Sequence, residues 1–157
     1  QNFVALRGDS ERRNAWLKWA VNPNATGYHI YFGNDPNKLY NSVMVYGVSE
    51  YYLNALEKND YVSFKSEEHD NYMITNNVVS HDDFVARSED IMKKVGAKTV
   101  SENIAFNYNS PQAAVDAWLK SPSHKENIEG NFTHFGIAIR ENPATGKKYY
   151  TNIFVRI

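Results

Sequence analysis

Apolar residues change their spacing near Ser63, and this change limits the folds that the 157-residue chain can adopt. Residues 16–21 alternate at a period of two, which is typical of a strand. Residues 84–95 carry apolar side chains three and four positions apart, which is the period of a helix. No linker separates the two patterns. We therefore expect a β-rich module at residues 1–62 and a helix-rich module at residues 63–157.

Short strands about ten residues apart are predicted throughout the first module. Turn-forming residues separate them, for example the Asn-Asp-Pro-Asn cluster at residues 34–37. Regular spacing of this kind favours half of an antiparallel β-sandwich. The predicted strands cover residues 16–21, 27–33, 42–46, 50–56 and 61–64.

Trp19 before a turn, the segment ATGYHIY at residues 25–31, and Leu56 followed by Tyr61 form a recognisable set. They resemble a fibronectin type III module of the kind appended to bacterial carbohydrate-active enzymes. The resemblance implies that Trp19 and Tyr31 lie in the core and that Tyr61 approximates the tyrosine corner. It stops before the last strand of a complete sandwich.

This resemblance makes an accessory module of a carbohydrate-degrading enzyme one interpretation of the chain. The rings of Trp16, Tyr28 or Tyr46 would then stack on a polysaccharide. Packing of the same rings in a core is the competing interpretation, and it is the more frequent arrangement for any single ring.

Composition excludes several classes of protein. The 17 Lys and Arg residues against 18 Asp and Glu give a net charge of −1, too little positive charge to bind nucleic acid through its phosphates. No apolar run reaches the roughly 20 residues of a transmembrane segment, and we expect none. The absence of cysteine excludes disulfides, thiolate metal sites and a cysteine nucleophile.

Start and stop signals for helices are clear in the second module. Ser80-His81-Asp82-Asp83 is predicted to begin a helix that Gly96 ends, and Ser110-Pro111 is predicted to begin another that ends near Ser121. A shorter helix is predicted at residues 66–76. Strands at residues 132–140 and 148–156 flank a turn and are expected to form an antiparallel hairpin.

Histidines and one acid are the candidates for chemistry. We expect His81, Glu102 and His124 to lie in three separate turns, from which they would converge on a divalent metal or act as a general acid–base group. In the alternative interpretation, Glu102 and Asn103 tie loops together by hydrogen bonds while His81 and His124 cap helix ends. Spacing alone favours the alternative. His29, His69 and His134 are predicted to be packed or surface residues.

Five ordered blocks in the second module carry another resemblance: residues 80–81 (SH), 101–105 (SENIA), 117–128 (AWLKSPSHKENI), 132–136 (FTHFG) and 149–154 (YYTNIF). Together they resemble the CAP superfamily of cysteine-rich secretory proteins, antigen 5 and pathogenesis-related proteins. The absence of cysteine matches its bacterial branch. The resemblance implies an α/β/α sandwich and hence an α+β chain that is secreted, periplasmic or on the bacterial cell surface.

The family's cleft commonly holds two histidines and two acids, sometimes with zinc. The resemblance implies that His81 and Glu102 are two of these residues and that His124 is a substitute third, so that zinc would be held by His81, Glu102 and His124. Ser121 and Tyr149 stand at the other two positions and are expected to line the same cleft. The family's usual first helix is predicted to be missing.

Four functional interpretations follow. The resemblance to CAP proteins favours a module that binds a lipid or another small hydrophobic molecule, or a structural module, without catalysis. A metal-dependent hydrolase using His81, Glu102 and His124 is an alternative, as is the carbohydrate-enzyme accessory module. Because both resemblances look truncated near Ser63, a fused or engineered chimera is the fourth, and a domain-swapped homodimer would complete either half.

Overall fold

The computed structural model describes residues 3–6, 14–32, 41–54 and 56–157. Contacts divide the chain into an N-terminal unit, residues 1–55, and a C-terminal unit, residues 56–157. The predicted boundary at Ser63 instead falls within a helix. The turn predicted at residues 34–37 lies outside the described residues. Within the described part of the chain, no helix is long and apolar enough to span a membrane.

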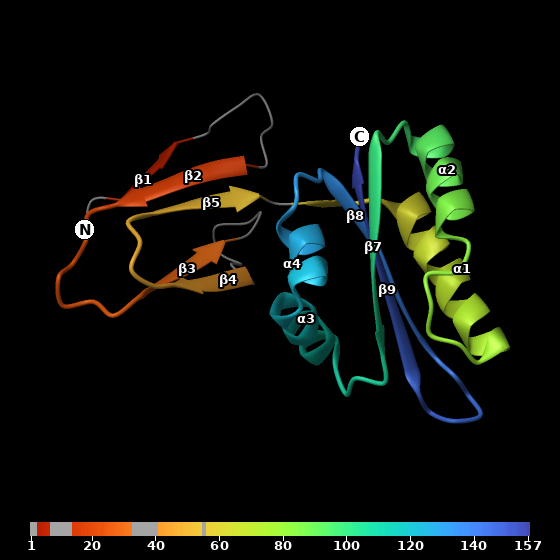
Figure 1. Ribbon diagram of the computed structural model, residues 1–157. Coiled ribbons are helices and arrows are strands. Elements are labelled where there is room, and N and C mark those ends of the chain that lie inside the picture. The colour runs from red at the N-terminus through yellow and green to blue at the C-terminus, as the bar shows by residue number, and fades with distance from the viewer. Residues whose placement is uncertain (1–2, 7–13, 33–40, 55) are drawn as a thin grey trace. The chain divides into compact units, whose positions relative to one another are not determined.

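The N-terminal unit consists of antiparallel strands, as expected from its two-residue period. Its strands form one sheet in the order β1-β2-β5 and a second sheet of β3 and β4 (Figure 1). Leu17, Ile30 and Val45 form its buried cluster, with Trp19 and Tyr28 packed against it. The strand bounds are β1 Phe3–Leu6, β2 Asn14–Trp19, β3 Tyr28–Phe32, β4 Asn41–Val45 and β5 Glu50–Asn54.

Two of the residues expected to mark a fibronectin type III core are placed otherwise. Tyr31 is 57% exposed, and its hydroxyl contacts Nδ1 of His29 at 3.0 Å. Tyr61 lies in a helix of the C-terminal unit rather than at a corner of a sandwich. Of the rings expected to stack on sugar, Tyr46 is exposed, whereas Tyr28 packs on Trp19 with 5.2 Å between ring centroids.

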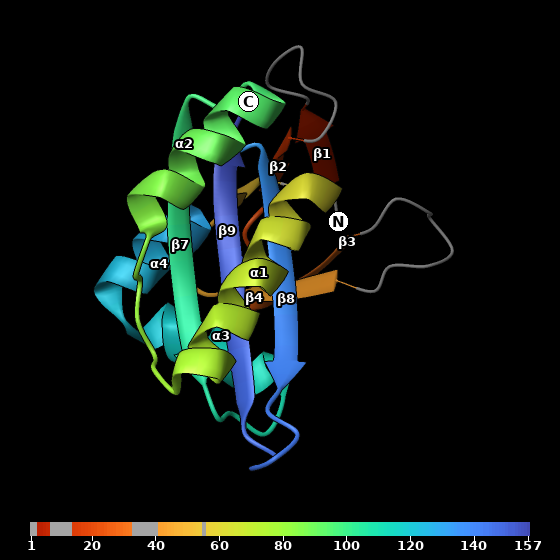
Figure 2. The same ribbon diagram turned by 90° about the vertical axis from the view of Figure 1, so that its right-hand side faces the viewer.

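The C-terminal unit is a three-layer α/β/α sandwich. Its sheet has the order β6-β8-β9-β7, with only the β6–β8 pair parallel. Helices α1 and α2 lie on one face and α3 and α4 on the other (Figures 1 and 2). The predicted helices beginning near residues 80 and 110 and the C-terminal hairpin are present. The bounds are β6 Glu57–Lys58, α1 Asp60–Asn76, α2 Phe84–Val95, β7 Thr99–Phe106, α3 Pro111–Lys120, α4 Pro122–Glu129, β8 His134–Glu141 and β9 Lys148–Arg156.

Helix α1 overturns two predictions, the strand at residues 61–64 and the missing first helix. It begins after Asn59, whose side chain accepts a hydrogen bond from the backbone N–H of Val62, and it runs for 17 residues. Its buried positions follow the helical period but three of the five are polar, so no apolar stripe marks the helix in the sequence. These positions are Val62, Ser66, His69, Asp70 and Met73.

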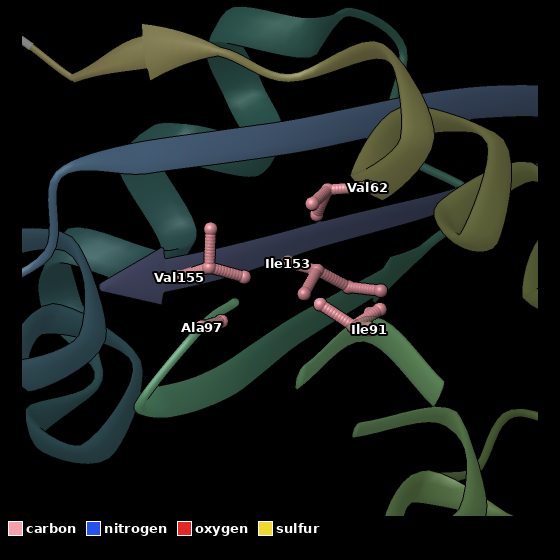
Figure 3. Packing of buried hydrophobic residues seen from close by; sticks show 5 residues of the cluster. All are labelled: Val62, Ile91, Ala97, Ile153 and Val155. Atoms are coloured by element: carbon pink, nitrogen blue, oxygen red, sulfur yellow. The ribbon is translucent and has the colours of Figure 1, made fainter. Parts of the chain in front are cut away.

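Apolar clusters hold helices to both faces of the sheet. On the α1 and α2 face, Val62 and Ile91 pack against Ile153 and Val155 of β9 (Figure 3). Here α1 crosses β8 at Gly136, where an added Cβ would lie 2.2 Å from backbone atoms of α1. Only glycine permits this approach.

The opposite face is held by Trp118 of α3, which packs with Ala105, Ala114 and Tyr150. Its indole N–H also donates to the carbonyl of Ile104 at 2.9 Å. Strand β7 is at the end of the strand order. The bond from Trp118 therefore occupies a carbonyl group of an edge strand, which cannot then pair with another chain.

Candidate functional site

Glu102 is the buried anchor of the candidate site. It belongs to β7, although a turn was predicted there, and its side chain is 1% exposed. Arg87 of α2 donates from Nε to Oε2 and from Nη2 to Oε1, each at 2.9 Å. Paired, charge-assisted bonds of this kind compensate a carboxylate for the loss of water. Glu102 is therefore held in place and is not a free acid or base.

His81 joins this pair from the loop before α2. Its Nδ1 lies 2.9 Å from Oε1 of Glu102, while its side chain is 54% exposed. Since an ionised carboxylate only accepts hydrogen bonds, the proton lies on Nδ1. A neutral His81 then presents Nε2 as a lone-pair acceptor on the exposed side of the ring.

His124 lies in α4 rather than in the predicted turn. Its Nδ1 contacts Oγ of Ser121 at 2.8 Å. Burial lowers the pKa of His124, and His81 lowers it further through the positive charge of its protonated form. His81 is thus near enough to influence His124, and the neutral form of His124 is favoured.

The predicted site residues form two pairs rather than one set. His81 contacts Glu102, and Ser121 contacts His124. Tyr149 does not line a cleft as expected, because it is 2% exposed in a core cluster with other apolar side chains. Side chains alternate between the two faces of the sheet along β9, and residues 149, 151, 153 and 155 therefore share the face that α1 and α2 cover.

A three-ligand zinc site is not assembled from these residues. In the part of the chain that the structure describes, no group of three or more His, Asp or Glu side chains is placed to hold a metal ion. Both oxygens of Glu102 are engaged by Arg87, so coordination by His81, Glu102 and His124 would require Arg87 to move. His81, Glu102 and His124 therefore do not form the predicted three-ligand zinc site.

Asn103 ties two segments together by hydrogen bonds, which is the alternative role expected from the sequence. Its Nδ2 donates to the backbone carbonyl of His124 at 3.0 Å, and its Oδ1 accepts from Nδ2 of Asn127 at 2.8 Å. Asn103 is fully buried, so these bonds satisfy an amide that has no access to water. They fasten α4 to β7 and so fix the position of His124.

His69 was missed as a member of the site. It is 2% exposed, with Nε2 2.8 Å from the carbonyl of Ser80 and 3.9 Å from Oε1 of Glu102. Burial lowers the pKa of His69. The sequence feature that could have identified His69 is the helical spacing of Val62, Ser66, His69 and Met73. This spacing becomes visible only when polar residues are counted as possible members of the buried face of a helix.

Asp70 is a second buried ionisable group that the sequence did not reveal. Oγ1 of Thr151 donates to its Oδ1 at 2.6 Å, whereas Oδ2 has no hydrogen-bond partner among the described residues. Burial raises the pKa of Asp70 to about 7. This carboxyl group is therefore protonated through the acidic range.

Comparison with known proteins identifies the family. The model of the cysteine-rich secretory protein family, CAP, matches residues 49–155. The uncharacterized protein YkwD of Bacillus subtilis is 43% identical over 56 residues, which are 34% of this chain and 22% of YkwD. The uncharacterized membrane protein YlbC of the same organism is 35% identical over 63 residues, 40% of this chain and 16% of YlbC. The chain thus matches less than a quarter of these relatives' length.

Two solved bacterial structures share the fold. An outer surface protein of Borrelia burgdorferi has a TM-score of 0.59 at 22% identity, over 66% of this chain and 79% of that one. An extracellular protein of Bacillus anthracis that contains an SCP domain has a TM-score of 0.56 at 17% identity, over 100% of this chain and 68% of that one. None of these matches supports a fibronectin type III module or a chimera. The family model covers more than half of the chain, which therefore belongs to the cysteine-rich secretory protein (CAP) family.

Proposed function

We propose that the chain is part of a bacterial extracytoplasmic protein and that its CAP domain is a binding module with His81 as the ligand contact. The location is supported by two structural neighbours that are described as an outer surface protein and an extracellular protein. The observation that carries the binding role is the state of Glu102, which is buried and bonded through both oxygens, while the His81 ring above it stays exposed.

The ligand expected at His81 is small and polar. Nε2 of His81 accepts a hydrogen bond, so it suits a ligand with a hydroxyl or amide N–H group. The ring contacts the carboxylate of Glu102, which in turn binds the guanidinium of Arg87, so the groups next to His81 are charged. A lipid tail would have to bury apolar surface against them, which desolvates charged groups without compensation. We therefore favour a polar ligand over the lipid suggested by the family resemblance.

Nuclear magnetic resonance of the histidine rings tests this role. The 15N-labelled full chain is titrated with N-acetylglucosamine as a hydroxyl and amide donor, with sodium sulfate as a pure acceptor, and with phosphatidylglycerol vesicles as a lipid surface. We expect a saturable shift of His81 Nε2 with N-acetylglucosamine alone, lost in His81→Ala and retained in His29→Ala. A His81 response only to sulfate or vesicles, or no response, would overturn the proposal.

A two-histidine metal site is the second candidate. His81 and His124 both have Nδ1 engaged by an oxygen, and within the described residues no hydrogen bond is formed by either Nε2. A carboxylate that orients a histidine from behind is typical of the outer sphere of metal sites. Glu102 would then be an outer-sphere residue, and its engagement by Arg87 argues against hydrolysis with Glu102 as the base.

Calorimetry with zinc chloride distinguishes the two candidates. If the imidazoles bind metal, the heat of binding is lost in both His81→Ala and His124→Ala and is retained in His29→Ala. Equal heats in wild type and both variants would remove the metal site while leaving the polar-ligand proposal to its own test.

A further inference from the structure

A groove lies beside β8, at the margin of the sheet that α1 covers (Figure 2). Ser63, Phe64 and Glu67 of α1 line one side of it, and residues 137–140 of β8 line the other. The groove measures about 530 Å³, which is within the range of ligand-binding clefts. His81 is not among the residues that line it, so the groove is distinct from the site of the proposed function.

The strand that flanks β8 at this margin is very short. Strand β6 pairs with β8 only at His134 and Phe135, whereas β8 continues to Glu141. In the part of the chain that the structure describes, β6 is the last strand of the sheet on this side. The edge of β8 beyond Phe135 is therefore open to a further strand.

Hydrogen bonds at the two ends of β8 show which backbone groups face this open edge. The carbonyl of Phe135 accepts from the N–H of Asn59 at 2.8 Å, on the side of β6. At the other end, the N–H of Asn142 donates back across the β8–β9 hairpin at 2.8 Å. Successive residues of a strand direct their backbone groups to opposite sides. Ile137 and Ile139 therefore face the open edge, as Phe135 faces β6.

Three of the four backbone groups of Ile137 and Ile139 are free. The N–H and carbonyl of Ile137 and the N–H of Ile139 face away from β9, and no other described segment bonds to them. The carbonyl of Ile139 accepts from Nη1 of Arg140 at 3.0 Å, and Glu67 binds the same guanidinium. A parallel strand bonds the carbonyl of one residue of its neighbour and the N–H of the residue two positions later. The free carbonyl of Ile137 and the free N–H of Ile139 form this pair.

The groove favours an uncharged and partly apolar occupant. Its four charged side chains form two ion pairs, Lys58 with Asp60 and Arg140 with Glu67. A charged occupant would lose water without gaining a free counter-ion. Phe64 lines the groove and is 52% exposed, so it offers an apolar contact.

From these observations we propose that the open edge of β8 binds an extended, uncharged segment of a partner protein, which adds to the sheet as a strand parallel to β8. One residue of the segment donates to the carbonyl of Ile137 and accepts from the N–H of Ile139, and it therefore lies opposite Ala138. Ala138 shares its face of the sheet with Gly136, which meets α1. An apolar side chain at this residue of the segment therefore lies on the side of Phe64.

A second copy of the chain fits this edge less well than a separate segment. Two β8 strands that pair antiparallel about Ala138 would share only the groups of Ile137 and Ile139, because β6 already occupies Phe135 on each copy. Such a pairing forms two hydrogen bonds, whereas a parallel segment uses all three free groups and leaves the bond of Arg140 intact.

The capped pentapeptide acetyl-VTVTV-amide is the probe that tests this assignment. It is titrated into the 15N-labelled full chain, and we expect saturable shifts of the amide resonances of Ile137 and Ile139. With valines toward Phe64, the valine N–H groups face β8. A form N-methylated on its valines should therefore bind at least about tenfold more weakly, whereas a form N-methylated on its threonines should bind like the parent peptide. Equal binding of the two forms, or no saturable shift, would overturn the proposal.

Phe64→Ala removes the apolar contact and should weaken binding of the pentapeptide about fivefold. Val85→Ala, which truncates an exposed apolar side chain of α2 instead, is the matched control and should leave binding unchanged. His81→Ala should also leave it unchanged, which separates this groove from the site of the proposed function. Undiminished binding in Phe64→Ala would overturn the assigned orientation. In sedimentation velocity, a dimer of the full chain that the pentapeptide dissociates would replace the partner segment by a second copy.

Discussion

Helices α1 and α3 pack on opposite faces of the same sheet, and they do so with different chemistry. Helix α3 buries Ala114 and Trp118 in an apolar cluster. Helix α1 buries Ser66, His69 and Asp70 beside its apolar residues. The buried residues of α3 itself are apolar apart from the indole N–H of Trp118, whereas α1 needs a hydrogen bond for each of three polar side chains that it removes from water.

This difference also concerns the buried part of the candidate site. The polar groups under α1 connect it to its neighbours through Ser80, Thr151 and the backbone of Gly136. Glu102 and the residues that bind it lie on the same face of the sheet. The face that carries Glu102, Arg87 and His81 is thus the one whose helix α1 buries the most polar side chains, and four substitutions test this comparison.

The largest effect is expected on the apolar side, at Trp118. Trp118→Ala removes a buried indole and its hydrogen bond to Ile104, and it should lower the free energy of unfolding of the C-terminal unit by about 4 kcal/mol. Hydrogen exchange of the β9 amides measures this unfolding. Leu119→Ala, at a more exposed position of the same helix, is the control. A loss below that of Leu119→Ala would show that α3 contributes little to the fold.

On the polar side, Asp70 makes stability depend on pH. Because burial raises its pKa from 3.8 to about 7, the folded protein holds this proton more tightly than the unfolded chain does. This contribution is complete below about pH 4 and is lost as pH rises through 7. Relative to Asp70→Asn, wild type should lose up to about 4 kcal/mol between pH 4 and pH 8.

Urea unfolding at several pH values measures this difference, followed by the 19F signal of fluorotryptophan at Trp118, the tryptophan of residues 56–157. His69 titrates in both proteins and so cancels from the comparison. Asp116→Asn, which replaces an exposed carboxylate, should keep the wild-type profile. Parallel profiles for wild type and Asp70→Asn would refute the protonated state of Asp70.

Gly136 tests how closely α1 must approach the sheet. Gly136→Ala places a methyl group 2.2 Å from backbone atoms of α1, so the helix must shift and stability should fall by about 3 kcal/mol. Gly146→Ala is the matched control, with a φ of +69° and open space around it, and should cost about 1 kcal/mol. Equal losses in the same fluorotryptophan assay would mean that α1 tolerates displacement.

The contrast between an apolar buried face on α3 and a partly polar one on α1 also explains which elements could be predicted from the sequence. Helices α2 and α3 and the β8–β9 hairpin follow from apolar period and start signals, and the family resemblance supplied the α/β/α order. Helix α1 did not follow, because Ser66, His69 and Asp70 interrupt its apolar stripe. Its first turn, with Tyr61, Val62 and Phe64, also matches a strand.

Only those residues of the candidate site that lie in recognisable motifs could be predicted from the sequence. His81, Glu102 and His124 stand in the family's blocks; the structure pairs His81 with Glu102 but pairs His124 with Ser121 instead. Arg87 carries no motif, and its partner lies 15 residues away on another element. A bond of that range depends on the packing of α2 against β7, which no local pattern specifies.

The smallest effect on stability is expected at His81. Its exposed ring makes one bond to Glu102, so His81→Ala should change the free energy of unfolding by less than about 1 kcal/mol. Arg87→Ala leaves the Glu102 carboxylate buried without its main partner and should cost about 3 kcal/mol. The fluorotryptophan assay compares the two variants directly. If His81→Ala were as destabilising as Arg87→Ala, His81 would be a structural member of the buried group, and the division between anchored residues and an exposed ligand contact would fail.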